Sequence, residues 1–251
     1  CLYCMPQHGA GFEPWKELLS YEEICRLARC FAELGITKVR ITGGEPLIRK
    51  DVVHLIFLLR EIPGLQEIAL STNGVFLAPL ARRLKQAGLD RVNVSLDTLN
   101  RDTFRKIAGM DRLGDVLAGI EEAKTAGLVP VKINTVLMRG VNDGEILDLV
   151  RLAVRLSLEV RLIELMPTNG LVSLNPQEAF MSAEEAKARI EETFELLPED
   201  TYFSSPAQVF RIAGHEARVG FISPLSNVFC ARCNRLRLKA NGALKTCLHG
   251  K

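Results

Sequence analysis

Strand-like and helix-like segments alternate along most of the chain, and this alternation is the strongest constraint on its fold. Short apolar runs alternate with longer segments in which apolar residues recur every three or four positions. Such a pattern predicts parallel strands joined by right-handed helical crossovers, hence an α/β barrel or an open parallel sheet. The expected strands are 38–42, 67–71, 91–96, 129–136 and 160–166, and the expected helices are 20–34, 51–61, 77–87, 113–125 and 142–157.

The pattern changes after Met166, and we therefore expect a first domain at residues 1–167 and a C-terminal extension at residues 168–251. A Ser182 cap begins an amphipathic helix, and Asn241-Gly242 between two short alternating runs predicts a hairpin with a primed turn. The remaining expectations are a helix at 182–194, short strands at 209–213 and 218–222, hairpin strands at 235–239 and 244–246, and irregular chain at 97–112, 168–177 and 197–206.

The amino-acid composition limits the classes of function that this chain can have but does not identify one. The 251 residues are 47% hydrophobic, and 32 Lys and Arg against 30 Asp and Glu give a net charge of +2. This balance does not call for nucleic acid or a membrane surface, and no apolar run reaches the roughly 18 residues of a membrane-spanning helix. The expected location is the cytoplasm, where seven cysteines favour reduced thiols and metal ligation over a disulfide framework.

Ligand-binding residues in parallel α/β folds lie at the carboxyl ends of the strands. Four short segments follow expected strands, and Lys132 would also stand at such an end if its strand is short. The segments are Thr42-Gly43-Gly44-Glu45, Ser71-Thr72-Asn73, Ser95-Leu96-Asp97 and Glu164-Leu165-Met166.

Two groups of cysteines have metal-ligand spacing. Cys1 and Cys4 form a C-x-x-C pair that is compatible with zinc, with redox chemistry or with an iron–sulfur cluster. Cys230, Cys233 and Cys247 form a second group, because the expected hairpin returns the third thiol toward the first two. Zinc with His249 as a fourth ligand is one interpretation of the second group. The other is a 4Fe–4S cluster with three protein ligands, which leaves one iron open to a small molecule.

Taken together, these motifs resemble the GTP 3′,8-cyclase family of radical S-adenosylmethionine enzymes, also called the molybdenum cofactor biosynthesis protein A family. The resemblance extends over the whole chain. It is carried by Cys1-Leu-Tyr-Cys-Met-Pro6, Arg40-Ile-Thr-Gly-Gly-Glu-Pro-Leu-Ile-Arg49, Thr72-Asn73-Gly74, Asn93-Val-Ser-Leu-Asp97 and Cys230-x₂-Cys233-x₁₃-Cys247. It implies an incomplete parallel (βα)₆ barrel followed by a β-rich segment that carries a second cluster. The family motif is C-x₃-C-x₂-C, so the first strand and the first cluster cysteine are expected upstream of Cys1.

The resemblance also assigns roles to individual residues, with no catalytic group beyond the cofactor and cluster ligands. It implies two 4Fe–4S clusters, the first held by Cys1 and Cys4 and the second by Cys230, Cys233 and Cys247. The implied S-adenosylmethionine contacts are Tyr3, Gly43, Gly44, Glu45, Ser95 and Met166. The implied GTP contacts are Arg40, Ser71, Lys132, Arg235, Leu236 and Arg237. Ser71 stands where the family commonly has threonine.

The activity implied by the resemblance is an early step of molybdenum cofactor biosynthesis. Reductive cleavage of S-adenosylmethionine yields a 5′-deoxyadenosyl radical, which takes hydrogen from C3′ of GTP so that this carbon adds to C8. The product is (8S)-3′,8-cyclo-7,8-dihydroguanosine 5′-triphosphate. The implied partners are a one-electron donor protein and the downstream cyclic pyranopterin monophosphate synthase, and a homodimer is compatible with the resemblance.

Two other functions are compatible with the cysteine motifs. A peptide-modifying radical enzyme with an auxiliary cluster domain would also use cysteines as cluster ligands. Such domains usually carry more cysteines, however, and this alternative does not explain the presence of Arg235 and Arg237. A zinc-stapled scaffold without catalytic activity would need only the thiols.

Overall fold

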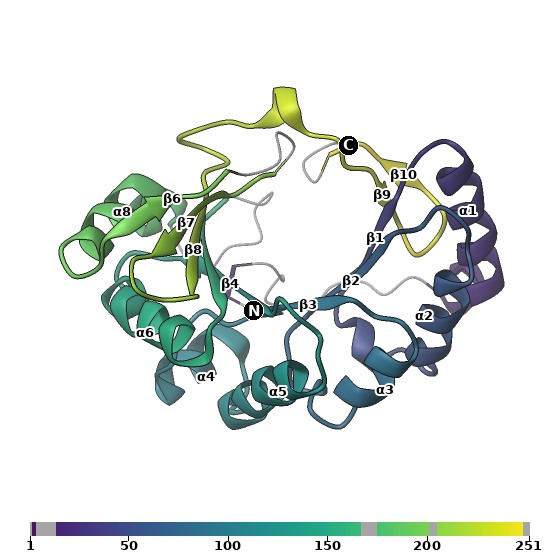
Figure 1. Cartoon of the computed structure of the whole chain (residues 1–251), viewed down its shortest axis with the longest axis horizontal. Coiled ribbons are helices and arrows are strands. Elements are labelled where there is room, and N and C mark those ends of the chain that lie inside the picture. The colour runs from purple at the N-terminus through teal and green to yellow at the C-terminus, as the bar shows by residue number, and fades with distance from the viewer. Residues whose placement is uncertain (1, 4–13, 167–174, 201–204, 248–251) are drawn as a thin grey trace. The chain divides into compact units, whose positions relative to one another are not determined.

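The computed structural model describes residues 2–3, 14–166, 175–200 and 205–247 (Figure 1). The chain forms two compact units, each assembled from separate stretches of sequence. Unit 1 consists of Cys1–Ala10, Ser95–Leu113 and Lys132–Asn234, and unit 2 consists of Gly11–Val94, Gly114–Val131 and Arg235–Lys251.

The strands follow the expected order, and their bounds differ from the predicted ones by a few residues. In chain order they are β1 (Lys38–Ile41), β2 (Glu67–Thr72), β3 (Arg91–Ser95), β4 (Lys132–Leu137), β5 (Glu159–Glu164), β6 (Leu196–Pro198), β7 (Gln208–Ile212), β8 (Arg218–Ile222), β9 (Arg237–Leu238) and β10 (Leu244–Lys245).

The helices of the described residues include both long crossovers and single turns. They are η1 (Trp15–Glu17), α1 (Tyr21–Glu33), η2 (Pro46–Ile48), α2 (Val52–Arg60), α3 (Ala81–Gln86), α4 (Arg101–Ala108), α5 (Leu113–Thr125), η3 (Asp143–Glu145), α6 (Ile146–Leu156), α7 (Pro176–Ala179), α8 (Ala183–Glu191) and η4 (Cys230–Arg232). Among these helices, none combines the length and apolar character needed to cross a membrane.

Unit 2 contains the parallel strands β1, β2 and β3, in that order. Alternate side chains point to opposite faces of a strand, so each strand here has an apolar face and a polar face. Ile68, Leu70, Val92 and Val94 are fully buried, and α2 packs against β2. The alternate positions carry Arg40, Ser71 and other polar residues, which leaves a polar face on the same sheet.

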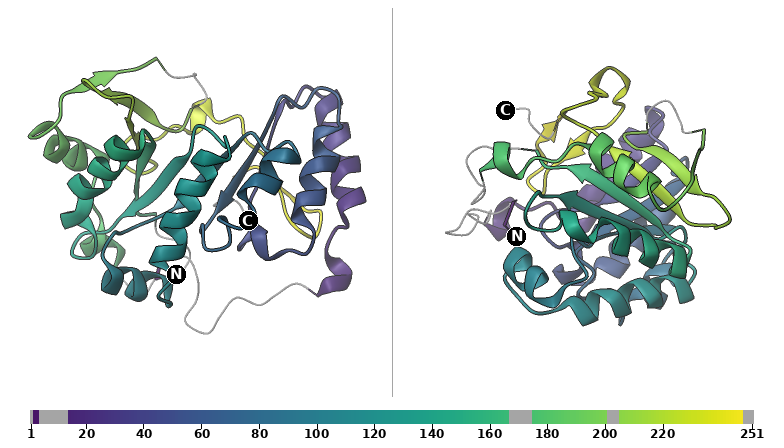
Figure 2. Two further views of the ribbon diagram at one scale, coloured as in Figure 1. Left: turned by 60° about the horizontal axis from the view of Figure 1, so that its bottom comes forward. Right: turned by 90° about the vertical axis from the view of Figure 1, so that its left-hand side faces the viewer.

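Unit 1 contains β4, β5 and β8 as parallel neighbours, and β7 and β6 continue this order in antiparallel fashion. Helices α6 and α8 pack against β5 and β8, as Figure 2 also shows. The sheets are thus dominated by parallel pairs, and the prediction of an α/β fold with parallel strands is confirmed.

Local sequence signals place several elements correctly. The predicted capping box at α1 is present, because Ser20 Oγ accepts from Glu23 N at 3.2 Å and the Glu23 carboxylate accepts from Ser20 N at 2.8 Å. The predicted hairpin is present as β9 and β10 in antiparallel register, but the predicted primed turn is wrong. Gly242 N donates to Lys239 O at 3.0 Å, so Ala240 and Asn241 are the central residues of the turn, and the positive φ of 86° falls on Gly242 after them. Leu19 N donates to Ala240 O at 2.8 Å, which holds this hairpin to the segment before α1.

Three segments predicted to be irregular contain regular structure. Residues 168–177 include the start of α7, which Asn175 caps by accepting from Gln177 N at 3.1 Å. Residues 97–112 include α4, which Asn100 caps by accepting from Asp102 N and Thr103 N, and which ends at Gly109 with a φ of 77°. These are strong cap residues, but four charged side chains in the helix leave only Phe104 and Ile107 on its buried face. Residues 197–206 likewise include part of β6, whose pairing with β7 is not encoded locally.

A close approach between α5 and the turn after β2 gives a test of packing in unit 2. A Cβ added at Gly119 would lie 2.7 Å from the Gly74 carbonyl oxygen, a backbone atom that cannot move away alone. We expect Gly119→Ala to lower the free energy of unfolding by about 1–3 kcal/mol in urea titrations. Gly114→Ala is the matched control on the same helix, since nothing lies within 4 Å of its Cβ position. Equal stability of the two variants would contradict the close packing.

Candidate active site

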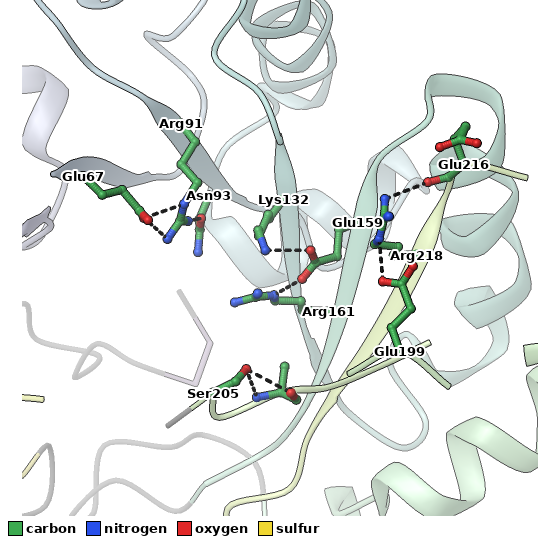
Figure 3. Close-up of polar contacts among 11 residues, drawn as sticks. Glu67, Arg91, Asn93, Lys132, Glu159, Arg161, Glu199, Ser205, Glu216 and Arg218 are labelled. Carbon is green, nitrogen blue, oxygen red and sulfur yellow. Dashed lines mark hydrogen bonds and ion pairs between the residues drawn. The ribbon is translucent and has the colours of Figure 1, made fainter. Parts of the chain in front are cut away.

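On the polar face of unit 2, charged and polar side chains pair with one another through an ion pair and a hydrogen bond. Arg91 Nη2 lies 2.5 Å from Glu67 Oε1, and Arg91 Nη1 donates to Asn93 Oδ1 at 2.9 Å (Figure 3). Arg40 is exposed on β1, in register with Ala69, and Ser71 is in register with Asn93. Two of the predicted GTP contacts, Arg40 and Ser71, therefore share one polar strand face.

The polar face of unit 1 carries a nearly buried cluster of two cations and one carboxylate. Lys132 Nζ lies 2.6 Å from Glu159 Oε2, and Arg161 Nε lies 2.5 Å from Glu159 Oε1 (Figure 3). The three side chains are 14%, 7% and 10% exposed in the order Lys132, Glu159, Arg161. Burial alone would raise the pKa of Glu159, but the charges of Arg161 and Lys132 outweigh it and hold this pKa below the ordinary value. The carboxylate is therefore ionised at neutral pH and pairs with both cations.

The position of Lys132 corrects one prediction. Lys132 is the first residue of β4 and lies opposite Glu159 at the start of β5, so it does not stand at a carboxyl strand end. Its strand begins there because the ladder with β5 begins there.

Sequence reasoning missed Glu159 and Arg161. The available signal was a pair of charged residues two positions apart inside a strand whose other residues are mostly buried. Gly220 of β8 lies opposite Arg161, and a Cβ there would come within 3.3 Å of Arg161 Cγ. The absence of a side chain at Gly220 therefore leaves space for the side chain of Arg161.

The Gly43-Gly44-Glu45 segment follows β1, and its carboxylate binds the end of β2. Glu45 Oε1 accepts from Thr72 Oγ1 at 2.8 Å and from Leu47 N, while Oε2 accepts from Asn73 N at 2.7 Å. Three donors use three of the roughly four acceptor positions of a carboxylate, which leaves capacity for one more donor. Both glycines are exposed, and nothing lies within 4 Å of their Cβ positions, so a ligand can approach this backbone closely.

Tyr3 is anchored within unit 1 by its ring and by its hydroxyl group. The ring packs against an apolar cluster made by Ile107, Met138, Leu165 and Ala179. The hydroxyl donates to Asp97 Oδ2 at 2.8 Å, and Leu2 N donates to Ile107 O at 2.8 Å. Burial raises the pKa of Asp97 to about 6, although hydrogen bonds from Val136 N and Tyr3 act in the opposite direction. The segment between Cys1 and Cys4 is thereby attached to the end of β3 and to α4.

The other predicted cofactor contacts, Ser95 and Met166, belong to unit 1 and lie at or just beyond a strand end. Ser95 is the last residue of β3 and is exposed. Met166 lies two residues beyond β5 and is half-buried.

The described cysteines of the second predicted cluster are exposed and form no disulfide. Cys230 and Cys233 flank a single helical turn that Cys233 N closes by donating to Cys230 O at 3.1 Å, and Cys247 follows β10. Cys1 and Cys4 lie outside the described residues. Within neither unit do three His, Cys, Asp or Glu side chains of the described residues already converge as metal ligands. Exposed thiols on a tight C-x-x-C turn nevertheless suit an iron–sulfur cluster.

Arg235, Leu236 and Arg237 lie on the segment that leads into the hairpin. All three are exposed, with Leu236 53% exposed. Only Arg237 belongs to β9, so this strand begins later than the predicted start at residue 235.

Comparison with known structures identifies the fold. Residues 1–153 match the model of the Radical SAM superfamily. SuiB from Streptococcus suis shares the fold with a TM-score of 0.70 at 16% identity, over 99% of this chain and 57% of that one. Coproporphyrinogen III oxidase (HemN) from Escherichia coli, a radical SAM enzyme, gives a TM-score of 0.53 at 13% identity, over 92% and 54%. The fold is therefore that of the radical S-adenosylmethionine enzymes.

Closer relatives define the family within that class. Residues 158–251 match the model described as Molybdenum Cofactor Synthesis C. GTP 3′,8-cyclase from Moorella thermoacetica is 50% identical over 250 residues, and the protein of the same name from Thermodesulfovibrio yellowstonii is 46% identical. Each match covers 99% of this chain and 77% of the relative. The chain belongs to the GTP 3′,8-cyclase family.

The buried cluster around Glu159 generates a stability prediction. Glu159→Gln removes the nearly buried carboxylate that pairs with Lys132 and Arg161, and we expect it to lower the free energy of unfolding by about 3–5 kcal/mol at pH 7. Because the pKa of Glu159 is lowered in the fold, the difference from the wild type should shrink as the pH falls below the ordinary carboxyl value of 4.5.

Glu122→Gln is the matched control, because Glu122 pairs with Arg82 at the surface, where Arg82 is 72% exposed. Its loss should stay below about 1 kcal/mol. Urea titrations at several pH values measure both effects. A loss of less than about 1 kcal/mol in Glu159→Gln would contradict the assigned role.

Proposed function

We infer that this chain catalyses the radical S-adenosylmethionine-dependent cyclisation of GTP to (8S)-3′,8-cyclo-7,8-dihydroguanosine 5′-triphosphate, an early step of molybdenum cofactor biosynthesis. The observation that carries this inference is family membership along the whole chain, including the C-terminal region with Cys230, Cys233 and Cys247. The peptide-modifying and zinc-scaffold alternatives have no comparable support.

Two 4Fe–4S clusters and S-adenosylmethionine are the cofactors of this family. Cys1 and Cys4 are the proposed ligands of the first cluster, and Cys230, Cys233 and Cys247 those of the second. When bound, S-adenosylmethionine on the first cluster supplies the one-electron chemistry that removes the hydrogen atom from C3′ of GTP.

Unit-by-unit geometry supports the proposed S-adenosylmethionine contacts. In unit 2, Glu45 retains room for one more donor, which suits an α-amino group, and the open backbone at Gly43 and Gly44 suits close contact. In unit 1, the anchored Tyr3 and the strand-end residues Ser95 and Met166 are the proposed contacts.

Cations on the polar strand faces are proposed to bind the triphosphate. Glu159 holds both Lys132 and Arg161, and the guanidinium group of Arg161 has N–H donors beyond the Nε that contacts Glu159, which suits phosphate oxygens. We add Arg161 to the proposed substrate contacts on this geometry. Arg40, Arg235 and Arg237 supply further guanidinium groups, with Leu236 contributing backbone.

Ser71 completes the proposed substrate contacts, and its hydroxyl group takes the place of threonine in the family. Fixed cations and hydroxyl groups of this kind orient the ribose, so that C3′ and C8 of one GTP molecule can react with each other.

The proposed partners follow from this chemistry. A one-electron donor protein must reduce the first cluster, and cyclic pyranopterin monophosphate synthase would consume the product. We expect the reaction in the cytoplasm, and a homodimer is a proposed assembly.

A cysteine substitution separates the two clusters. In the natural gene product, reconstituted without oxygen, Cys247→Ala should retain S-adenosylmethionine cleavage and lose the cyclised nucleotide, because the second cluster would lose a ligand. Chromatography of 5′-deoxyadenosine and of the cyclised nucleotide measures both activities. Cys30→Ala is the matched control, since Cys30 is also an exposed free thiol but lies on α1. Normal product formation by Cys247→Ala would refute the role of the second cluster.

A further inference from the structure

Glu164, the last residue of β5, has a buried carboxylate with an unusually complete set of donors. The residue is 1% exposed. Its Oε1 accepts from Ala183 N at 3.1 Å and from the Ser226 hydroxyl group, and its Oε2 accepts from Leu225 N and Ser226 N at 3.0 Å each. A carboxylate has about four acceptor positions, so this one has no capacity left for a ligand.

The charge of Glu164 is favoured by these contacts. Burial would raise its pKa, but the hydrogen bonds from Ser226, Ala183 and Leu225 outweigh burial and hold the pKa below the ordinary value. An ionised, saturated carboxylate does not act as a general acid or base. Its role must lie in what it holds together.

The donors come from segments that are distant in sequence and important for the proposed site. Ser226 stands four residues before Cys230, a proposed ligand of the second cluster. Successive turns connect them, since Asn227 N donates to Ser223 O at 3.1 Å and Arg232 N donates to Phe229 O at 3.0 Å. In the other direction, Met166 lies two residues after Glu164.

We propose that Glu164 is a positioning residue that sets where unit 1 holds the second cluster, by fixing the turn at residues 223–226 to the end of β5. This proposal rests on the proposed function, because the second cluster is part of it. Of the described segments, only the turn at 223–226 and the start of α8 reach this carboxylate through the hydrogen bonds given above. A shift of the turn would therefore move Cys230 and Cys233 relative to the strand that ends near Met166.

The test substitutes the carboxylate and examines the second cluster directly. In the natural gene product with both clusters, Glu164→Gln keeps the shape but presents an amide N–H group to backbone N–H donors. We expect a changed electron paramagnetic resonance signal of the reduced second cluster and a fall in cyclised product of about tenfold or more. Cleavage of S-adenosylmethionine should continue.

Glu145→Gln is the matched control. Glu145 lies in the same unit, and its carboxylate accepts one hydroxyl and two backbone N–H groups, from Thr98, Leu99 and Asn100, where Glu164 accepts one hydroxyl and three backbone N–H groups. It is not connected to the cysteine segment by these hydrogen bonds, so the signal of the second cluster should be unchanged. Ser226→Ala removes a single donor from Glu164 and should change that signal in the same direction but less, and it decides the matter if Glu164→Gln does not fold.

The outcomes separate this proposal from the function itself. An unchanged signal of the second cluster in both Glu164→Gln and Ser226→Ala, or an equal change in Glu145→Gln, would overturn the positioning role. Failure of the wild-type protein to form cyclised nucleotide would instead overturn the proposed function, whatever the variants do.

Discussion

Carboxylates that contact several donors at once hold the proposed ligand-binding parts of this chain in place. Glu45 joins the segment after β1 to the end of β2, and Glu159 holds Lys132 beside Arg161. Removing a carboxylate from water costs several kcal/mol unless its charge is matched. The nearly buried carboxylate of Glu159 is therefore favourable only while its two cations stay in place, and the same contacts hold those cations. The proposed ligand-binding elements are thus held by contacts within the chain itself.

The polar faces of the strands distinguish this fold from a fully packed barrel. In an eight-stranded barrel, branched apolar side chains fill the interior. Here the faces opposite the buried apolar rows carry residues such as Arg40 and Ser71 in one unit and Lys132 and Arg161 in the other. Such faces suit a polyanion rather than side-chain packing. The net charge of +2 conceals this local concentration of cations, because the acidic residues lie elsewhere or serve as their partners.

The sequence predicted those features whose causes are local. Apolar periodicity placed the five main parallel strands, and the Ser20 and Glu23 pair placed the start of α1. The position of Lys132 was wrong because the start of β4 depends on its ladder with β5. Glu164 was noted at a strand end, but its donors Leu225 and Ser226 are 61 and 62 residues away, beyond any local pattern. The sequence motifs thus predicted the class of chemistry. The residues that hold the proposed site in place could be recognised only from the three-dimensional structure.

The central claim is that this chain directs hydrogen abstraction to C3′ of GTP. The most direct test incubates the natural gene product, without oxygen and with both clusters, with S-adenosylmethionine, a reductant and GTP deuterated at C3′. Mass spectrometry then locates the label. The account predicts deuterium in 5′-deoxyadenosine together with a cyclised nucleotide that lacks it. Deuterium retained in the nucleotide, or cleavage of S-adenosylmethionine with no cyclised nucleotide, would contradict it.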